Sequence, residues 1–140
     1  MKSLALAALA TLALAGTALA QDIVPPPAVT IAVATGNSTA VVSFTSPGDQ
    51  CTNATCGAYD LRYSTSVITE CNFTGANSIS TTSPQSPGNP ECFELSALDC
   101  NTTYYWALKT QDTSGNWSVI SNVVTKATKL CNQHQEVACQ

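Results

Sequence analysis

The stretch NTTYYWALKTQDTSGNWSVISNVV, residues 101–124, decides the fold. Its first half places Tyr104, Trp106 and Leu108 at alternate positions, which is the pattern of a β-strand with one buried face. A polar turn, DTSGN, follows, and a second alternating run begins at Trp117. The stretch therefore predicts two strands joined by a turn. Its aromatic side chains can serve as a core, a binding face or the wall of a catalytic site.

The composition of the 140-residue chain excludes several classes of partner. Asp and Glu number 9 against 5 Lys and Arg, which gives a formal net charge of −4. Such an acidic chain lacks the basic surface that binds nucleic acid or anionic membranes. Charged residues are sparse, and Thr, Val and Tyr favour strands. We therefore expect an extracellular β protein that binds no nucleic acid.

The N-terminus, MKSLALAALATLALAGTALA, has the features of a secretory signal peptide. Lys2 precedes an apolar, Ala-rich run, and Ala18-Leu19-Ala20 is a small-x-small cleavage pattern. The alternative is a membrane anchor, but the run is short for a segment that must span a bilayer. We expect residues 1–20 to be removed, the protein to be secreted to the extracellular space or cell surface, and no part of it to insert in a membrane.

The remainder has the size of one domain. Residues 21–27 are a Pro-rich N-terminal segment, residues 28–127 the folded domain, and residues 128–140 a Cys-containing C-terminal tail. Period-two alternation between turn residues predicts seven short strands. They are expected at Ala28–Ala34, Thr39–Phe44, Ala58–Ser64, Ser66–Phe73, Glu91–Leu95, Thr103–Thr110 and Trp117–Lys126. This number and spacing of strands predicts an all-β, antiparallel sandwich of two sheets.

Several of these segments together resemble the fibronectin type III family. They are SPGD at 46–49, AYDLRYST at 58–65, LDCNTTYYWALKT at 98–110 and DTSGNWSVISNVV at 112–124. The resemblance implies a seven-stranded antiparallel, immunoglobulin-like sandwich, with Tyr104 as the tyrosine corner whose hydroxyl bonds to backbone upstream. The family's usual core tryptophan in the second strand is Phe44 here, so Trp106 is expected to supply volume. Cys100 replaces a proline of the family signature.

The outer face of the 103–110 strand is the candidate contact surface. Tyr105 and Lys109 point away from the expected core. WSVIS at 117–121 is similar to the Trp-Ser-x-Trp-Ser stretch of cytokine-receptor modules, in which an aromatic ring stacks on cations of a neighbouring strand. Lys109 or Arg62 is therefore expected to stack on Trp117. The motif is structural in the first instance and a ligand site in the second.

Seven cysteines follow the expected signal peptide, which fits export to an oxidising compartment. In the topology that the resemblance implies, the ends of the sandwich favour the pairs Cys51–Cys56, Cys71–Cys92 and Cys100–Cys131, with Cys131–Cys139 as the main alternative to the last. Cys139 then remains either for an intermolecular bridge or as a free thiol in the tail.

Five Asn-x-Ser/Thr triplets are candidate N-glycosylation sites, and all lie in or beside expected turns. Their asparagines are Asn37, Asn53, Asn72, Asn101 and Asn116. Their use depends on a host that glycosylates.

Catalytic and metal-binding patterns are absent from the sequence. His134 in the tail is the one histidine, the carboxylates form no motif, and no Cys-x-x-Cys pair occurs. We expect no catalytic residue, metal or cofactor. The favoured function is a secreted, non-catalytic module for protein binding, adhesion or structural assembly. The alternative is a carbohydrate-binding module that uses Tyr63, Tyr105 and Trp117, and self-association through Cys139 is a variant of the first.

Overall fold

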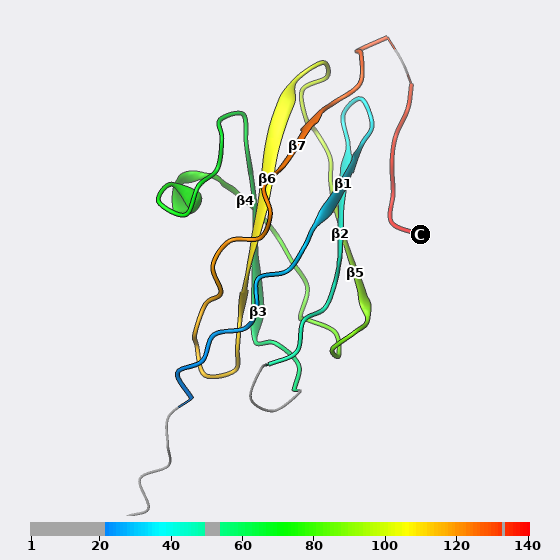
Figure 1. Ribbon diagram of the computed structural model, residues 1–140. Coiled ribbons are helices and arrows are strands. Elements are labelled where there is room, and N and C mark those ends of the chain that lie inside the picture. The colour runs from blue at the N-terminus through cyan, green and yellow to red at the C-terminus, as the bar shows by residue number, and fades with distance from the viewer. Residues whose placement is uncertain (1–21, 50–53, 133) are drawn as a thin grey trace, which may run out of the picture.

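The computed structural model describes residues 22–49, 54–132 and 134–140. Its strands form two antiparallel sheets that face each other (Figure 1). A three-stranded sheet has the order β1-β2-β5, and a four-stranded sheet has the order β4-β3-β6-β7. The strands are β1 (Ala32–Thr35), β2 (Ala40–Thr45), β3 (Ala58–Ser64), β4 (Asn77–Ile79), β5 (Pro90–Leu95), β6 (Thr103–Gln111) and β7 (Val124–Ala127). The predicted seven-stranded antiparallel sandwich is confirmed.

Alternation along the strands builds the core between the sheets. From β6, Trp106 and Leu108 point inward and are fully buried, and Leu61 of β3 meets them on the same sheet. Val42 and Phe44 of β2 face them from the other sheet. Each such side chain contributes about 1.5–3 kcal/mol when it is removed from water. Burial of these core side chains thus supplies most of the favourable free energy of folding.

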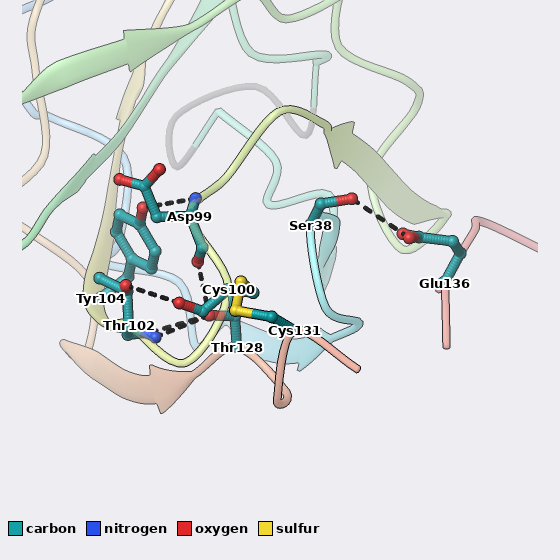
Figure 2. The surroundings of a disulfide bond; sticks show 8 residues. All are labelled: Ser38, Asp99, Cys100, Thr102, Tyr104, Thr128, Cys131 and Glu136. Atoms are coloured by element: carbon teal, nitrogen blue, oxygen red, sulfur yellow. Dashed lines mark hydrogen bonds between the residues drawn. A yellow bond between two sulfur atoms is a disulfide. The ribbon is translucent and has the colours of Figure 1, made fainter. Parts of the chain in front are cut away.

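Aromatic rings fill one half of this core. Tyr63 stacks on Trp106 with ring centroids 5.6 Å apart, and Tyr104 lies 6.0 Å from the same indole. The hydroxyl of Tyr104 accepts a hydrogen bond from the backbone N–H of Asp99 at 3.1 Å (Figure 2). This is the tyrosine corner expected from the sequence. Trp106 is fully buried, as expected, while Phe44 packs in the other half against Tyr59 at 5.0 Å.

The predicted strand at Ser66–Phe73 is wrong. Residues 66–76 instead form a lobe on the outer face of the four-stranded sheet, and this lobe includes the 3₁₀ turn η1 (Phe73–Gly75) (Figure 1). Asn72 shapes it, because its Oδ1 accepts from Thr69 N (2.7 Å) and its Nδ2 donates to Val67 O (2.9 Å). The turn lets Ile68 and Phe73, five positions apart, bury on the same side, which a straight strand would not allow. The strand β4 follows the lobe.

The first and last strands begin later than the sequence suggests. Before β1, Ile31 is held by Asn122, whose Oδ1 accepts from Ile31 N (2.8 Å) and whose Nδ2 donates to Ile31 O (3.0 Å). The side chain of Asn122 thus makes the two hydrogen bonds to Ile31 that the backbone of a paired strand would otherwise make. Regular pairing starts only at Ala32 in β1 and at Val124 in β7.

Candidate functional site

The segment at Trp117 lies along β6 without forming a regular strand. Ser118 N donates to Thr110 O (2.8 Å), and Ser118 Oγ accepts from Thr110 N (3.0 Å). Ser121 repeats the pattern with Leu108, at 2.8 and 3.0 Å. Each serine hydroxyl occupies the place that a strand carbonyl would take. The predicted strand start at Trp117 is therefore wrong, yet the segment is firmly anchored.

The turn before Trp117 is ordered by one buried carboxylate. Asp112 Oδ1 accepts from the backbone N–H groups of Ser114 (2.8 Å) and Asn116 (2.7 Å), and Oδ2 accepts from Asn116 Nδ2 (2.6 Å). Burial alone would raise the pKa of Asp112, but these hydrogen bonds outweigh it and lower the pKa below its ordinary value. The negative charge of Asp112 thus fixes the loop that presents Trp117.

Two segments that meet at this turn carry exposed apolar side chains. Trp117 is 41% exposed and Val119 64%, while Ile23 and Val24 of the N-terminal segment are 75% and 42% exposed. The two segments are joined where Asn116 Nδ2 donates to the backbone oxygen of Asp22 at 3.0 Å. We call Ile23, Val24, Trp117 and Val119 the Trp117 face. Of these four residues, the sequence had indicated only Trp117 as a surface residue.

The expected stacking of Arg62 or Lys109 on Trp117 is wrong. Both cations lie 5.3 Å from the ring centroid of Phe73, which belongs to the lobe. Lys109 also pairs with Glu70. Phe73 thus takes the role that the sequence assigned to Trp117, because the lobe covers this face of the sheet.

Arg62 and Glu70 complete the contacts of the lobe with the sheet. Arg62 Nε and Nη2 bond both oxygens of Asp60 at 2.8 and 3.0 Å, and Nη1 donates to the backbone oxygens of Thr74 and Ala76. Glu70 accepts from Lys109, and also from Ile120 N at 2.9 Å. These bonds lower the pKa of Glu70. The cations therefore hold the lobe in place.

Tyr105, another expected contact residue, also serves the lobe. It is half-buried and packs against a cluster formed by Ile68, Phe73 and Ala107. Tyr63 is half-buried and stacked on Trp106 in the core. Of the proposed surface residues, only Trp117 presents a large exposed ring among the residues described.

The cysteines pair only in part as expected. Cys100 and Cys131 form a disulfide, as predicted (Figure 2). Cys139 is bonded to Cys92, so the prediction of an unpaired Cys139 is wrong. The predicted Cys71–Cys92 bridge is also wrong, and Cys71 carries an exposed free thiol.

The lobe explains the failed Cys71–Cys92 prediction. It carries Cys71 to the outer face of the four-stranded sheet. Cys92 alternates with buried Glu91 and Phe93 on β5, so its side chain points outward from the three-stranded sheet. The two residues therefore lie on opposite faces of the sandwich. Cys56 is a buried free thiol in the structure, and its predicted partner, Cys51, lies outside the described residues.

The buried polar groups around Cys56 and Tyr59, at one end of the sandwich, form hydrogen bonds within the protein. Cys56 Sγ–H donates to Pro47 O at 2.9 Å, and burial followed by the charge of Asp49 raises the pKa of this thiol. The Tyr59 hydroxyl lies 2.9 Å from Ser46 Oγ and 3.1 Å from Glu91 Oε1, and burial raises the pKa of the phenol. A protonated, buried thiol is a poor nucleophile. The cluster therefore has the character of a hydrogen-bonded core.

The candidate glycosylation sites differ in their surroundings. Asn101 is exposed, with its backbone at φ 51°. Asn72 is exposed but uses its amide inside the lobe. Asn116 donates through Nδ2 to both Asp22 and Asp112. Asn37 is half-buried, and its Oδ1 is buried without a partner among the described residues. Asn53 lies outside the described residues.

No three His, Cys, Asp or Glu side chains in 22–49, 54–132 and 134–140 lie together in a way that could hold a metal. In the same ranges, the structure contains no helix with the length and hydropathy needed to cross a bilayer.

No protein-family model matches the chain, and no curated protein matches it. Solved structures do. The FN1–FN3 domains of chicken CNTN1 superpose with a TM-score of 0.54 over 74% of this chain and 33% of that chain, at 18% identity. A fibronectin type III domain derived from the human KIAA0970 protein gives a TM-score of 0.51 at 11% identity, over 80% of this chain and 82% of that chain.

This chain has the fibronectin type III fold. The sheet orders β1-β2-β5 and β4-β3-β6-β7 and the tyrosine corner at Tyr104 agree with that assignment. The chain spans a third of the length of the chicken fragment, which contains several domains. At these identities the likeness concerns the fold alone, so function rests on the side chains of this chain. The two intramolecular disulfides found among the described residues of this chain are consistent with an extracellular location.

Proposed function

We propose that the protein is a secreted, non-catalytic module that binds an extracellular protein through the Trp117 face. The observation that carries the proposal is the exposure of Trp117 and Val119 next to a turn that is hydrogen-bonded to the segment carrying exposed Ile23 and Val24. Two disulfides support action in an oxidising, extracellular space. The expected signal peptide, residues 1–20, supports the same location.

The chemistry of the face favours an apolar protein surface as the partner. Its four side chains carry no charge, and tryptophan is among the residues that contribute most to protein interfaces. The face is also fixed before binding. Asp112 orders the turn, and Ser118 and Ser121 attach the following segment to β6. A prearranged face loses little conformational entropy when a partner binds.

Occupancy of the Asn116 sequon would interfere with this role. Asn116 Nδ2 donates both to Asp22 O and to Asp112 Oδ2. An amide that carries a glycan keeps one hydrogen, so it would lose one of these two bonds. The contacts therefore favour an unmodified Asn116, which leaves the neighbouring Trp117 ring free of a glycan.

Carbohydrate binding is the second candidate, because the exposed indole of Trp117 is a flat aromatic surface. The other two aromatics of that hypothesis are already used, since Tyr63 stacks on Trp106 and Tyr105 packs under the lobe. Of the three rings in that hypothesis, only Trp117 remains available to a sugar, whereas a protein partner can also contact Val119, Ile23 and Val24. This difference favours a protein partner.

The internal use of reactive groups supports a non-catalytic role. The thiol of Cys56 is buried with a raised pKa, and Glu91 accepts hydrogen bonds from Tyr59 and from the backbone N–H of Gln85. A positioned acid, base or nucleophile beside an open cleft is what catalysis requires. These groups instead face the interior.

The test uses the oxidised protein against two defined collections of ligands: purified extracellular ectodomains and immobilised glycans. We expect an ectodomain to bind, and Trp117→Ala and Val119→Ser each to weaken that binding at least tenfold, as for the central residues of an interface. Val67→Ser is the matched control, because Val67 is an apolar residue of the lobe, 55% exposed, that lies outside the Trp117 face.

Three results would contradict the proposal. The first is binding that Trp117→Ala leaves unchanged, and the second is binding that Val67→Ser weakens equally. The third is a glycan signal that depends on Trp117 with no ectodomain bound, which would establish the carbohydrate alternative instead.

A further inference from the structure

The C-terminal residues 134–140 return along the three-stranded sheet, beside β1 and β2 (Figure 1). We call them the strap. Most of the strap is exposed, while Val137 and Cys139 are half-buried. Three hydrogen bonds of its backbone attach it: Asn37 N to Gln135 O (2.8 Å), Val137 N to Thr39 Oγ1 (3.1 Å) and Cys139 N to Glu94 Oε1. Ser38 Oγ adds a bond to Glu136 Oε1 at 3.1 Å (Figure 2).

The strap borders the outer face of the three-stranded sheet. Val41 of β2 points to this outer face, because it alternates with the core residues Ala40 and Val42, yet it is only 8% exposed. The next outward residue, Ser43, is exposed. Val41 and Ser43 line an open groove together with Ala138 and Cys139 of the strap. A buried apolar side chain thus lies in the same groove as the strap, on an otherwise open face.

Gly36 shows that the strap fits closely. A Cβ atom built on Gly36 would lie 2.3 Å from Gln135 O and 2.9 Å from Glu136 Cα. Distances below 3.0 Å require something to move. Two of the neighbours are backbone atoms of the strap, and the third is the side-chain atom Thr39 Oγ1 at 2.6 Å. The turn between β1 and β2 thus admits the strap only because residue 36 has no side chain.

The two disulfides hold the tail at opposite ends. Cys100–Cys131 lies before the strap, where the chain is also held by Thr128 N to Thr102 O (2.9 Å) and Thr128 Oγ1 to Asp99 O (2.7 Å) (Figure 2). Cys92–Cys139 is the one covalent attachment of the strap itself. Both of its cysteines are half-buried and line the open groove.

We propose that the strap is a redox-sensitive cover of the three-stranded sheet, released when the Cys92–Cys139 bond is reduced. The reductant is a dithiol, either a small molecule or an oxidoreductase. One of its thiolates attacks a sulfur of the bridge and displaces the other cysteine as a thiolate. Its second thiol then resolves the mixed disulfide, so Cys92 and Cys139 end as thiols and the reductant as a disulfide. Release uncovers Val41 and extends the open groove beside it.

The test is amide hydrogen exchange of residues 134–140 in three oxidised proteins: the parent, Cys92→Ser/Cys139→Ser, and the matched control Cys100→Ser/Cys131→Ser. We expect exchange at the backbone amides of positions 137 and 139 to rise at least tenfold when the Cys92–Cys139 bond is absent. In the control double variant, the strap should keep the parent's protection. Near-ultraviolet circular dichroism from the buried Trp106 checks that each variant is folded.

Gly36→Ala supplies a second route that leaves all cysteines in place. We expect faster exchange at Val137 in this variant, because the new methyl group displaces Gln135 and Glu136 and also Thr39 Oγ1, the acceptor of the Val137 N–H. Unchanged protection of the strap in Cys92→Ser/Cys139→Ser, or equal loss of protection in both double variants, would overturn the proposal. So would unchanged exchange in Gly36→Ala.

Discussion

The tyrosine corner can be tested by the removal of a single oxygen atom. In Tyr104→Phe the ring keeps its contacts with Tyr63 and Trp106, while the N–H of Asp99 loses the acceptor that lay 3.1 Å away. A neutral hydrogen bond contributes about 0.5–1.5 kcal/mol net, and a buried donor left unpaired costs about 1–3 kcal/mol. Asp99 itself is exposed, so water can partly replace the hydroxyl. We expect the free energy of unfolding to fall by about 1 kcal/mol.

The assay is equilibrium unfolding in urea with both disulfides intact, monitored by tryptophan fluorescence. Tyr63→Phe is the matched control, because its ring also packs on Trp106, while its hydroxyl has no hydrogen-bond partner among the described residues. We expect the control to change the free energy by less than about 0.5 kcal/mol. A thermal scan should show Tyr104→Phe lowering Tm by roughly 4–8 °C per kcal/mol. Equal effects of the two variants would refute the assignment of the corner.

Three further predictions concern the Trp117 segment and the sequons. Ser118→Ala and Ser121→Ala each leave a buried β6 N–H without its hydroxyl acceptor, so each should lower the free energy of unfolding by about 1–3 kcal/mol in urea titrations; no change would contradict the anchoring role. In a host that glycosylates, peptide mass spectrometry should find a glycan on exposed Asn101 and none on Asn37, which the strap adjoins; the reverse pattern would contradict this. Because folding lowers the pKa of Asp112 from its unfolded value of 3.8, the ionised carboxylate stabilises the fold fully above pH 3.8. This stabilisation is lost as the pH falls through the pKa of the folded state. Asp112→Asn should therefore weaken the pH dependence of stability below pH 3.8, and an unchanged slope would count against that role.

The sandwich could be predicted because its information is local and periodic. Alternation in residues 58–64 and 103–110 identified β3 and β6 almost to their observed bounds, and these two strands form the centre of the four-stranded sheet. The strands depend on side-chain periodicity, which a single sequence displays directly. The tyrosine corner was implied instead by the resemblance of residues 98–110 to the fibronectin type III signature, which places Tyr104 at the start of a strand.

The lobe could not be predicted because its cause is not periodic. Val67, Ile68 and Phe73 have strand-like residue types, so alternation favoured a strand. The deciding interaction is the side chain of Asn72, which bonds to the backbone of Val67 and Thr69. Once the turn forms, Phe73 reaches the cations of the sheet and displaces Trp117 from that role. Because the strand at residues 66–73 was predicted wrongly, the contact of Arg62 or Lys109 with Trp117 was predicted wrongly too.

The Trp117 face was only partly predicted, for a related reason. Ile23 and Val24 belong to the N-terminal segment, which meets the 116–119 turn only through a tertiary contact, from Asn116 Nδ2 to Asp22 O. Sequence separation between the two segments is large, and nothing in either segment indicates the other. A surface built from distant segments requires the fold before its members can be named.

The positions of the two disulfides bear on what they stabilise. Each joins the C-terminal tail to the sandwich, across separations of 31 and 47 residues. In the chain-entropy account, loops of this length contribute about 4 kcal/mol each. The core has no need of a crosslink at its centre, since Trp106, Leu61 and Leu108 are fully buried there. The tail, by contrast, is largely exposed and held by few hydrogen bonds. The Cys92–Cys139 bond joins a weakly attached segment to a well-packed sandwich. Its removal should therefore loosen the strap while the two sheets stay folded, as a conformational role for this bridge requires.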